Sequence, residues 1–204
     1  MASRKKPSEI FLAWESIVFP ETGYEKVTSE LGRAAFFEIW EAKGSNDKYL
    51  ALDPEDADLL CTLGWKLAME KAHYEESLSW TRLMPLHPRF SELDSVRSMS
   101  PVRDAFYSFA YLGRIDELCS ATAELQANRD SLGWRCATGI LLLDEVFPPD
   151  DVVDPRILEV AKGVLGAKKR YARLVRLLER PGITYREMRE VGMKTFNSSG
   201  KVQP

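Results

Sequence analysis

The segment from Asp53 to Pro88 reads "DPEDADLLCTLGWKLAMEKAHYEESLSWTRLMPLHP", and the fold prediction starts from it. It begins with Asp-Pro, a typical helix start, because proline is tolerated at the first helical position and a carboxylate is favourable near the positive end of the helix dipole. Apolar residues then recur at three- and four-residue spacing in two blocks, and Gly64 lies where a second helix could cross closely. The chain must turn around residues 71–73, and Pro85 and Pro88 end the second block. The segment therefore predicts a helical hairpin that is too short to bury its own apolar face.

Proline and glycine divide the remaining sequence into further helical segments. Residues 8–19 and 24–44 have apolar side chains at the spacing of one helix face. Residues 104–125 and 157–179 each have the pattern of a helix, a short turn and a second helix. Strand signals are scarce, since no Asn-Gly or Asp-Gly turn joins two alternating β-branched runs. We therefore expect an all-α protein.

The 53–88 segment resembles the tetratricopeptide repeat. That family has a large residue, a Leu-Gly pair, an aromatic residue opening the second helix, a small residue before a leucine and a closing proline, at positions occupied here by Leu60, Leu63-Gly64, Tyr74, Ser77-Leu78 and Pro88. The turn lacks the family's usual glycine, and Ser77 stands where alanine is common. Residues 104–125 and 157–179 resemble degraded copies. The resemblance implies antiparallel helix pairs stacked as a right-handed superhelix, with a concave groove that binds a protein or peptide.

Four parts are predicted along the chain. N-terminal helices in residues 1–52 pack on the repeats, the repeats occupy residues 53–147, a basic helical pair occupies residues 148–196, and a disordered tail occupies residues 197–204. The boundary after residue 147 rests on a Pro- and Asp-rich loop and on a change in charge.

The net charge of −3 hides an asymmetry along the chain. From Arg156 to the C-terminus there are 12 Lys/Arg and 4 Asp/Glu, a balance of +8, whereas the preceding residues have a balance of −11. On a helix, the cations Lys169, Arg173, Arg176 and Arg180 share one face. Four interpretations of this face remain open: a solvated surface, a surface that docks on the acidic part of the same chain or of a second copy, a site for an acidic protein, and a site for nucleic acid phosphates.

The sequence contains none of the common catalytic or nucleotide-binding motifs. Its two histidines, His73 and His87, are too far apart and have too few neighbouring ligands to form a metal site. The acidic residues between 144 and 154 lack the spacing and the glycine of a calcium-binding loop, which favours a solvated acidic loop. We therefore predict no catalytic residues, no metal and no cofactor.

Positions beside the apolar stripe of the first helix of each hairpin are expected to line the groove. The candidate groove residues are Thr62, Trp65, Lys66 and Met69 from the first repeat, with Tyr107 and Tyr111 from the second. Trp80 is also expected to be rotated away from the core, and large exposed aromatic side chains are typical binding anchors. The alternative is that neighbouring repeats simply cover these side chains.

These patterns favour a non-catalytic module that binds a protein or peptide, as an adaptor, a chaperone or a regulatory subunit. One alternative is a nucleic-acid-binding regulator that uses the basic C-terminal helix. The other is an enzyme of an unrecognised family, which a pocket of perturbed titratable groups would favour. No membrane partner is expected, because apolar runs such as 139–147 are far shorter than a spanning helix. Three separated cysteines without a CxxC motif fit a reducing cytoplasm.

Overall fold

The computed structural model describes residues 47–70, 72–94, 97–127 and 131–199. These residues form α-helices and short 3₁₀ helices, and the one isolated β-bridge among them joins Val152 and Thr184. The predicted all-α class is confirmed for this part of the chain. The helices predicted at 8–19 and 24–44, and with them most of the predicted N-terminal part, lie outside the described residues.

The chain divides into two compact units, residues 1–104 (unit 1) and residues 105–204 (unit 2), and each is described by itself. The division falls inside helix α6 (Ser100–Leu112), whereas the sequence placed a boundary after residue 147. The physical reason is that helices before and after residue 147 pack on one another within unit 2. The Pro- and Asp-rich loop is therefore a connection inside unit 2.

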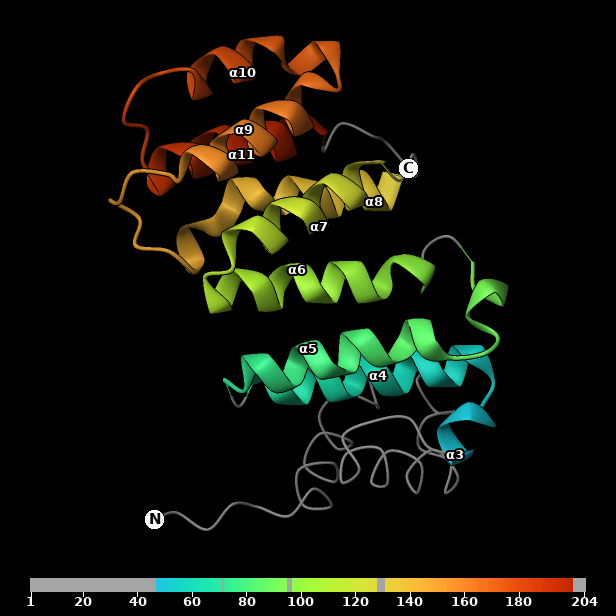
Figure 1. Cartoon of the computed structure of the whole chain (residues 1–204). Helices are drawn as coiled ribbons and strands as arrows, with labels where there is room; N and C mark the ends of the chain where they lie inside the picture. The colour runs from blue at the N-terminus through green and yellow to red at the C-terminus, as the bar shows by residue number, and fades with distance from the viewer. Residues whose placement is uncertain (1–46, 71, 95–96, 128–130, 200–204) are drawn as a thin grey trace, which may run out of the picture. The chain divides into compact units, whose positions relative to one another are not determined.

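Unit 1 contains the predicted hairpin. Helix α4 (Pro54–Glu70) begins at the predicted proline, helix α5 (Tyr74–Leu83) follows after a short turn, and the two helices pack against each other (Figure 1). The short helix α3 (Asp47–Leu50) precedes them, and three 3₁₀ helices follow: η2 (Met84–Leu86), η3 (Phe90–Glu92) and η4 (Arg97–Met99). Because η2, η3 and η4 intervene, the second hairpin begins farther along the chain than the roughly 34-residue tetratricopeptide period would place it.

Gly64 allows α4 and α5 to approach closely. A Cβ atom at this position would overlap the ring of Trp80, which lies on α5. Trp80 is only 5% exposed, so the expectation that it is rotated away from the core is wrong. The physical reason is the missing side chain at Gly64, which leaves room for the indole between the two helices.

The hydrophobic core of unit 1 joins both helices of the hairpin to the segments on either side. The Tyr49 hydroxyl of α3 donates a hydrogen bond to the Leu83 carbonyl oxygen at 3.3 Å. The buried His87 ring hydrogen-bonds the Leu52 carbonyl oxygen at 3.2 Å and meets Tyr49 edge to face. The buried members of this core are Tyr49, Leu52, Ala57, Leu60, Cys61, Leu63, Ala68, Trp80, Leu83 and Met84.

Unit 2 begins with the second half of α6 and continues as a series of helices packed on their neighbours. Helix α7 packs against α8 and α9, α9 packs against α10 and η5, and α11 packs against α10 and η5 (Figure 1). The bounds are α7 (Ile115–Ala127), α8 (Ser131–Ala137), η5 (Thr138–Glu145), α9 (Pro155–Gly166), η6 (Lys169–Tyr171), α10 (Ala172–Leu178) and α11 (Tyr185–Ser199).

The second hairpin, α6 and α7, turns at Gly113 as its sequence predicts, with the glycine at φ 65°. The third predicted pair corresponds to α9 and α10, but the helical structure is interrupted after Gly166 and resumes through η6. Helix α11 extends past the predicted boundary at residue 196 to Ser199, and the rest of the predicted tail lies outside the described residues.

Candidate functional site

The six predicted groove residues are divided between the two units. Tyr107 and Tyr111, the tyrosine pair of unit 2, lie one helical turn apart on α6 and are 41% and 43% exposed. The neighbouring face of the same helix buries Phe106 and Ala110. The Phe106 ring meets Tyr107 edge to face, with ring centroids 5.2 Å apart. The tyrosine pair is therefore an aromatic surface next to the buried face of its helix.

The groove residues of unit 1 lie on α4, and all four of them are half-buried. Trp65 packs against the hydrophobic core of unit 1, so part of its indole is already used in folding. Thr62 and Lys66 line up with Asp58 at four-residue spacing, which places the three on one side of the helix. This polar row of Asp58, Thr62 and Lys66 faces the first residues of α6.

The polar row meets a buried carboxyl group, Asp104, at the end of unit 1. Arg103 Nε donates a hydrogen bond to Asp104 Oδ1 at 2.8 Å, and Thr62 also hydrogen-bonds this carboxyl. The positive charges of Arg103 and Lys66 favour ionised Asp104, but its burial outweighs them and raises its pKa above the ordinary value. Asp104 is 3% exposed, so this carboxyl is part of the interior of unit 1.

Asp58 is the second buried carboxyl of the cluster and is 6% exposed. Burial and the neighbouring Asp104 raise the pKa of Asp58 to about 6, against the opposing effect of Arg103, Arg97 and a hydrogen bond with Ser100. Its Oδ1 atom has no hydrogen-bond partner in the part of the chain that the structure describes. The Asp58–Asp104 pair can therefore take up a proton in the mildly acidic range.

Cys61 and Tyr49 are the other strongly perturbed groups of unit 1. The two side chains are in contact, with 3.6 Å between the Tyr49 hydroxyl oxygen and Cys61 Sγ. Burial raises the pKa of the Cys61 thiol to about 12 and also raises the pKa of Tyr49. A thiol that stays protonated at neutral pH is a poor nucleophile, so this contact belongs to the core.

The predicted basic face of unit 2 is shorter than the sequence suggested. Arg173 and Arg176 are exposed on α10, but Lys169 lies in η6, and Arg180 follows the end of α10 at Leu178. Arg180 also donates to Glu187 Oε1 at 2.8 Å. The expectation that all four share one face of a continuous helix is wrong, because the turn after Gly166 and the early end of α10 place the outer two cations off the helix.

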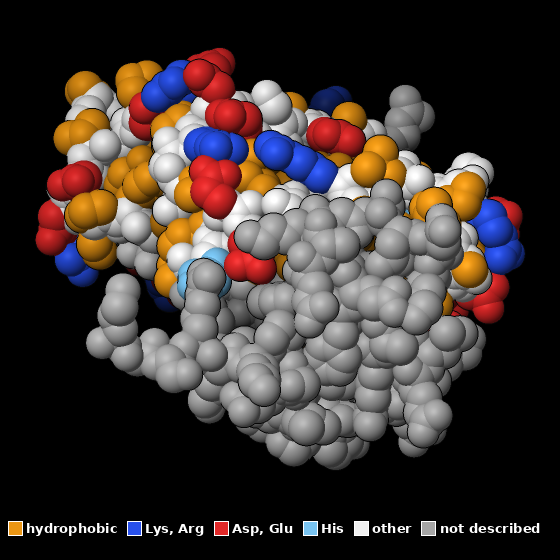
Figure 2. Space-filling view, turned by 60° about the horizontal axis from the view of Figure 1, so that its bottom comes forward, with side chains coloured by type: hydrophobic (Ala, Val, Ile, Leu, Met, Phe, Trp, Pro, Cys, Tyr) orange, Lys and Arg blue, Asp and Glu red, His pale blue; other side chains and the backbone are white. Residues whose placement is uncertain are grey.

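Carboxylates of the predicted acidic loop form ion pairs with arginines, while Asp150 and Glu145 stay exposed, as expected of a solvated loop. Arg186 donates to Asp150 Oδ1 at 2.9 Å, and Arg189 donates to Asp144 Oδ1 at the same distance. Asp154 caps the N-terminus of α9 by accepting from the backbone N–H of Arg156 at 2.8 Å. Arg186 and Arg189 are thus bound to carboxylates within unit 2, but neither is among the four cations of the predicted basic face. On the face drawn in Figure 2, acidic (red) and basic (blue) side chains also lie next to one another.

An aromatic stack supports the start of α10. The Trp134 ring stacks on Tyr171, with centroids 5.7 Å apart and planes 6° apart, and the Lys168 Nζ atom lies 3.7 Å from the centroid of a Trp134 ring. Tyr171 is 2% exposed. The two ends of this stack come from α8 and η6, so it fixes the position of the η6 backbone.

The sequence prediction missed the Asp58–Asp104 pair. The spacing of Asp58, Thr62 and Lys66 could have indicated that polar residues share one side of α4. It could not have indicated Asp104 opposite them, because that contact depends on how α6 packs.

No group of three or more His, Cys, Asp or Glu side chains placed to hold a metal ion occurs among the described residues. None of the described helices is both long and apolar enough to cross a membrane. In comparisons with known proteins, no family model, no curated protein and no solved structure matches this chain.

Proposed function

We propose that this chain is a non-catalytic helical-repeat module that binds a protein or peptide, as an adaptor, a chaperone or a regulatory subunit in the cytoplasm. The observation that supports this proposal most is the tyrosine pair. Two exposed tyrosines one turn apart offer a large contact area with only a small number of rotatable bonds, and the neighbouring face of their helix is buried through Phe106 and Ala110. Aromatic anchors of this kind contribute most of the binding energy in many interfaces.

The arrangement of helices in hairpins supports the same function. Antiparallel helix pairs that stack as in a tetratricopeptide superhelix leave one helix of each pair on a concave surface, where an extended or helical segment can bind. In this proposal the tyrosine pair is the binding surface of unit 2, and the α4 residues Thr62, Trp65, Lys66 and Met69 are the candidate binding surface of unit 1.

The test is partner capture followed by measurement with the purified partner. We expect the full chain to retain a protein partner from a lysate of its source cells, and the Tyr107→Ala/Tyr111→Ala variant to bind that purified partner at least about tenfold more weakly. The matched control is Val152→Ala/Met193→Ala, which removes two exposed apolar side chains of the same unit, 63% and 43% exposed. Equal affinity of wild type and the tyrosine variant, or equal loss in the control, would contradict the proposal.

The enzyme alternative has one observation in its favour, the buried pair of carboxyls with raised pKa values. However, both Asp58 and Asp104 are less than a tenth exposed, so a substrate does not reach either carboxyl in this conformation. The nucleic-acid alternative depends on the basic residues of η6 and α10, and it is separated from protein binding by the experiment of the next subsection.

A further inference from the structure

We propose that the basic surface formed by η6 and α10 binds an acidic segment of a partner protein. The surface consists of Lys169, Arg170, Arg173 and Arg176, all of them exposed. This surface is separate from the tyrosine pair. The inference rests on the proposed function in one respect only, that the partner is a protein.

The first argument is a difference between two sets of cations in unit 2. Four arginines are bound to carboxylates of their own unit: Arg156 to Asp154 and Asp116, Arg180 to Glu187, Arg186 to Asp150, and Arg189 to Asp144. The four cations of the η6–α10 surface have no carboxylate within ion-pair distance in the described part of unit 2. Four arginines of unit 2 are therefore paired with carboxylates, whereas the cations of this surface are not, and Arg170 lies 4.8 Å from the centroid of the Tyr171 ring.

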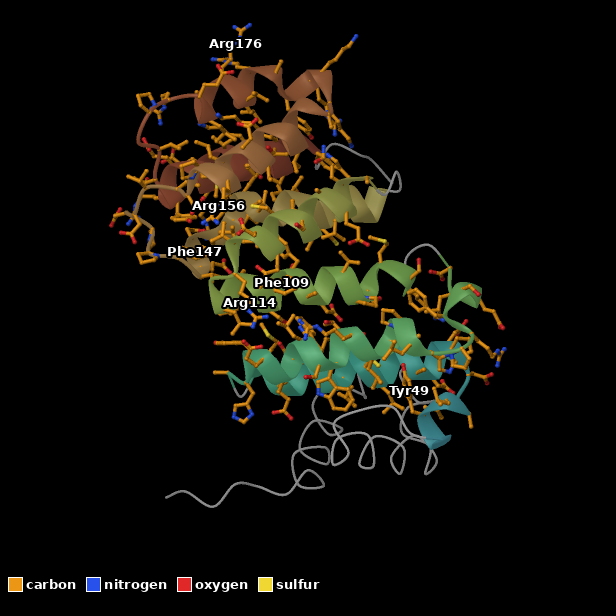
Figure 3. All side chains as sticks on the ribbon, in the orientation of Figure 1. Tyr49, Phe109, Arg114, Phe147, Arg156 and Arg176 are labelled. Atoms are coloured by element: carbon orange, nitrogen blue, oxygen red, sulfur yellow. The ribbon has the colours of Figure 1, made fainter. Side chains whose placement is uncertain are left out.

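The second argument is the rigid support beneath the surface. Tyr171 and Leu178 are buried on the underside of the segment, and α10 packs on α9 and α11. The Trp134–Tyr171 stack and the contact of Lys168 with Trp134 fix η6. Figure 3 shows Arg176 extending outward from α10, away from the neighbouring helices of unit 2. Because the backbone is held, a partner must order only the ends of the side chains.

The third argument is the spacing of the charges. Arg173 and Arg176 are three positions apart on α10. Arg170, in η6, is three positions before Arg173. Like charges at this separation repel each other in an isolated helix. A partner segment with carboxylates at helical spacing removes that repulsion, and each guanidinium can bind a carboxylate through two parallel hydrogen bonds.

A protein segment fits these observations better than nucleic acid. Four cations are fewer than the roughly six to ten phosphate contacts of a typical DNA-binding protein. Bases also need aromatic faces to stack on, and in this region Tyr171 is buried and Trp134 is already in contact with Tyr171 and Lys168.

The test measures binding of a fluorescent peptide to the full chain. The probe is an alanine-based helical peptide with four glutamates at three- and four-residue spacing, and the same peptide with glutamines is the neutral probe. We expect wild type to bind the glutamate peptide, the affinity to fall as salt rises, and Arg173→Gln/Arg176→Gln to weaken binding about tenfold or more. The matched control Arg180→Gln/Arg186→Gln removes the same charge from arginines already bound to carboxylates, and about a twofold change or less is expected.

The outcomes separate this proposal from its alternatives and from the proposed function. The Tyr107→Ala/Tyr111→Ala variant should bind the glutamate peptide like wild type, so failure of one surface does not imply failure of the other. Binding of the glutamine peptide with equal affinity, no binding of the glutamate peptide at low salt, or equal loss in the control would overturn the proposal. Tighter binding of a DNA duplex than of the peptide at the same salt concentration would overturn it in favour of nucleic acid.

Discussion

Ala72 and Gly113 occupy the same position in the chain turns that follow helices α4 and α6. Each adopts a left-handed conformation, with φ of 55° for Ala72 and 65° for Gly113. The backbone N–H after Ala72 bonds the Ala68 carbonyl at 2.9 Å, and the N–H after Gly113 bonds the Phe109 carbonyl at 3.0 Å. This is the Schellman ending of a helix, in which glycine is usual because a Cβ atom is unfavourable at positive φ. In the first turn, alanine therefore stands in the backbone conformation that glycine adopts in the second.

Ala72→Gly should stabilise the protein by about 1 kcal/mol, because it removes the strain of alanine at positive φ. Gly113→Ala should have the opposite sign and a similar size. No atom lies within 4 Å of a Cβ built at Gly113, so the effect there comes from the backbone alone. Denaturant unfolding midpoints provide the measurement. A destabilising Ala72→Gly would show that the first turn does not have this conformation.

The hairpins could be predicted because their signals are local. Asp53-Pro54 starts α4, Gly113 ends α6, and the apolar spacing between such signals identifies the helices. Each of these features depends on residues within one or two turns, so the sequence contains all the information needed. The approach of the two helices at Gly64 could also be predicted, because an isolated glycine in a helix often marks a close crossing.

Gly64→Ala should destabilise unit 1 by about 2 kcal/mol or more, because the added methyl overlaps the buried Trp80 ring and the indole must move. The matched control is Gly163→Ala on α9, where a Cβ meets no atom within 4 Å. Relief of the helical glycine penalty should make that control stabilising by about 0.5–1 kcal/mol. Thermal unfolding of both variants is the measurement, and a Gly64→Ala variant as stable as wild type would be incompatible with the packing of Trp80 on Gly64.

Trp80 and Arg180 show where prediction from local pattern fails. The rotation of Trp80 about its own helix axis suggested exposure, but its burial depends on the space left by Gly64 on another helix. Counting residues places Arg180 on a helix face, but α10 ends at Leu178. No local pattern indicates Asp104, because its contacts with the α4 polar row come from the packing of distant segments. The burial of Trp80 and the contacts of Asp104 depend on relations between segments, and the place of Arg180 depends on where one helix ends.

Cys61 should react with iodoacetamide much more slowly than Cys119 in the native protein. Cys61 is 5% exposed and burial raises the pKa of its thiol to about 12, so almost no thiolate is present at pH 8. Cys119 and Cys136 are partly exposed. Peptide mass spectrometry after timed labelling gives the three rates, and labelling in denaturant provides the control in which all three react. Equal native rates for Cys61 and Cys119 would show that the unit 1 core opens readily.

Asp58→Asn should stabilise the protein at pH 7–8, and the gain should disappear as the pH falls towards 4. The pKa of Asp58 in the folded protein, about 6, lies above the ordinary value of 3.8, so folding takes up a proton between pH 3.8 and 6. The contribution of Asp58 to the stability of the fold therefore decreases as the pH rises through that range. The ionised group faces Asp104, Arg103, Arg97 and Ser100, and asparagine keeps a similar shape without the charge. The shift corresponds to a gain of at most about 3 kcal/mol.

The measurement is the difference in unfolding free energy between Asp58→Asn and wild type at several pH values. Asp150→Asn is a control of opposite sign, because the hydrogen bond from Arg186 lowers the pKa of Asp150. The ionised Asp150 carboxylate therefore stabilises the fold above the pKa of the unfolded chain, and this contribution is lost as the pH falls. Asp58→Asn should therefore raise stability at neutral pH while Asp150→Asn lowers it. A loss of stability in Asp58→Asn at pH 7.5 would mean that Arg103 and Arg97 stabilise the Asp58 carboxylate more than burial destabilises it, and that the carboxyl pair takes up no proton near pH 6.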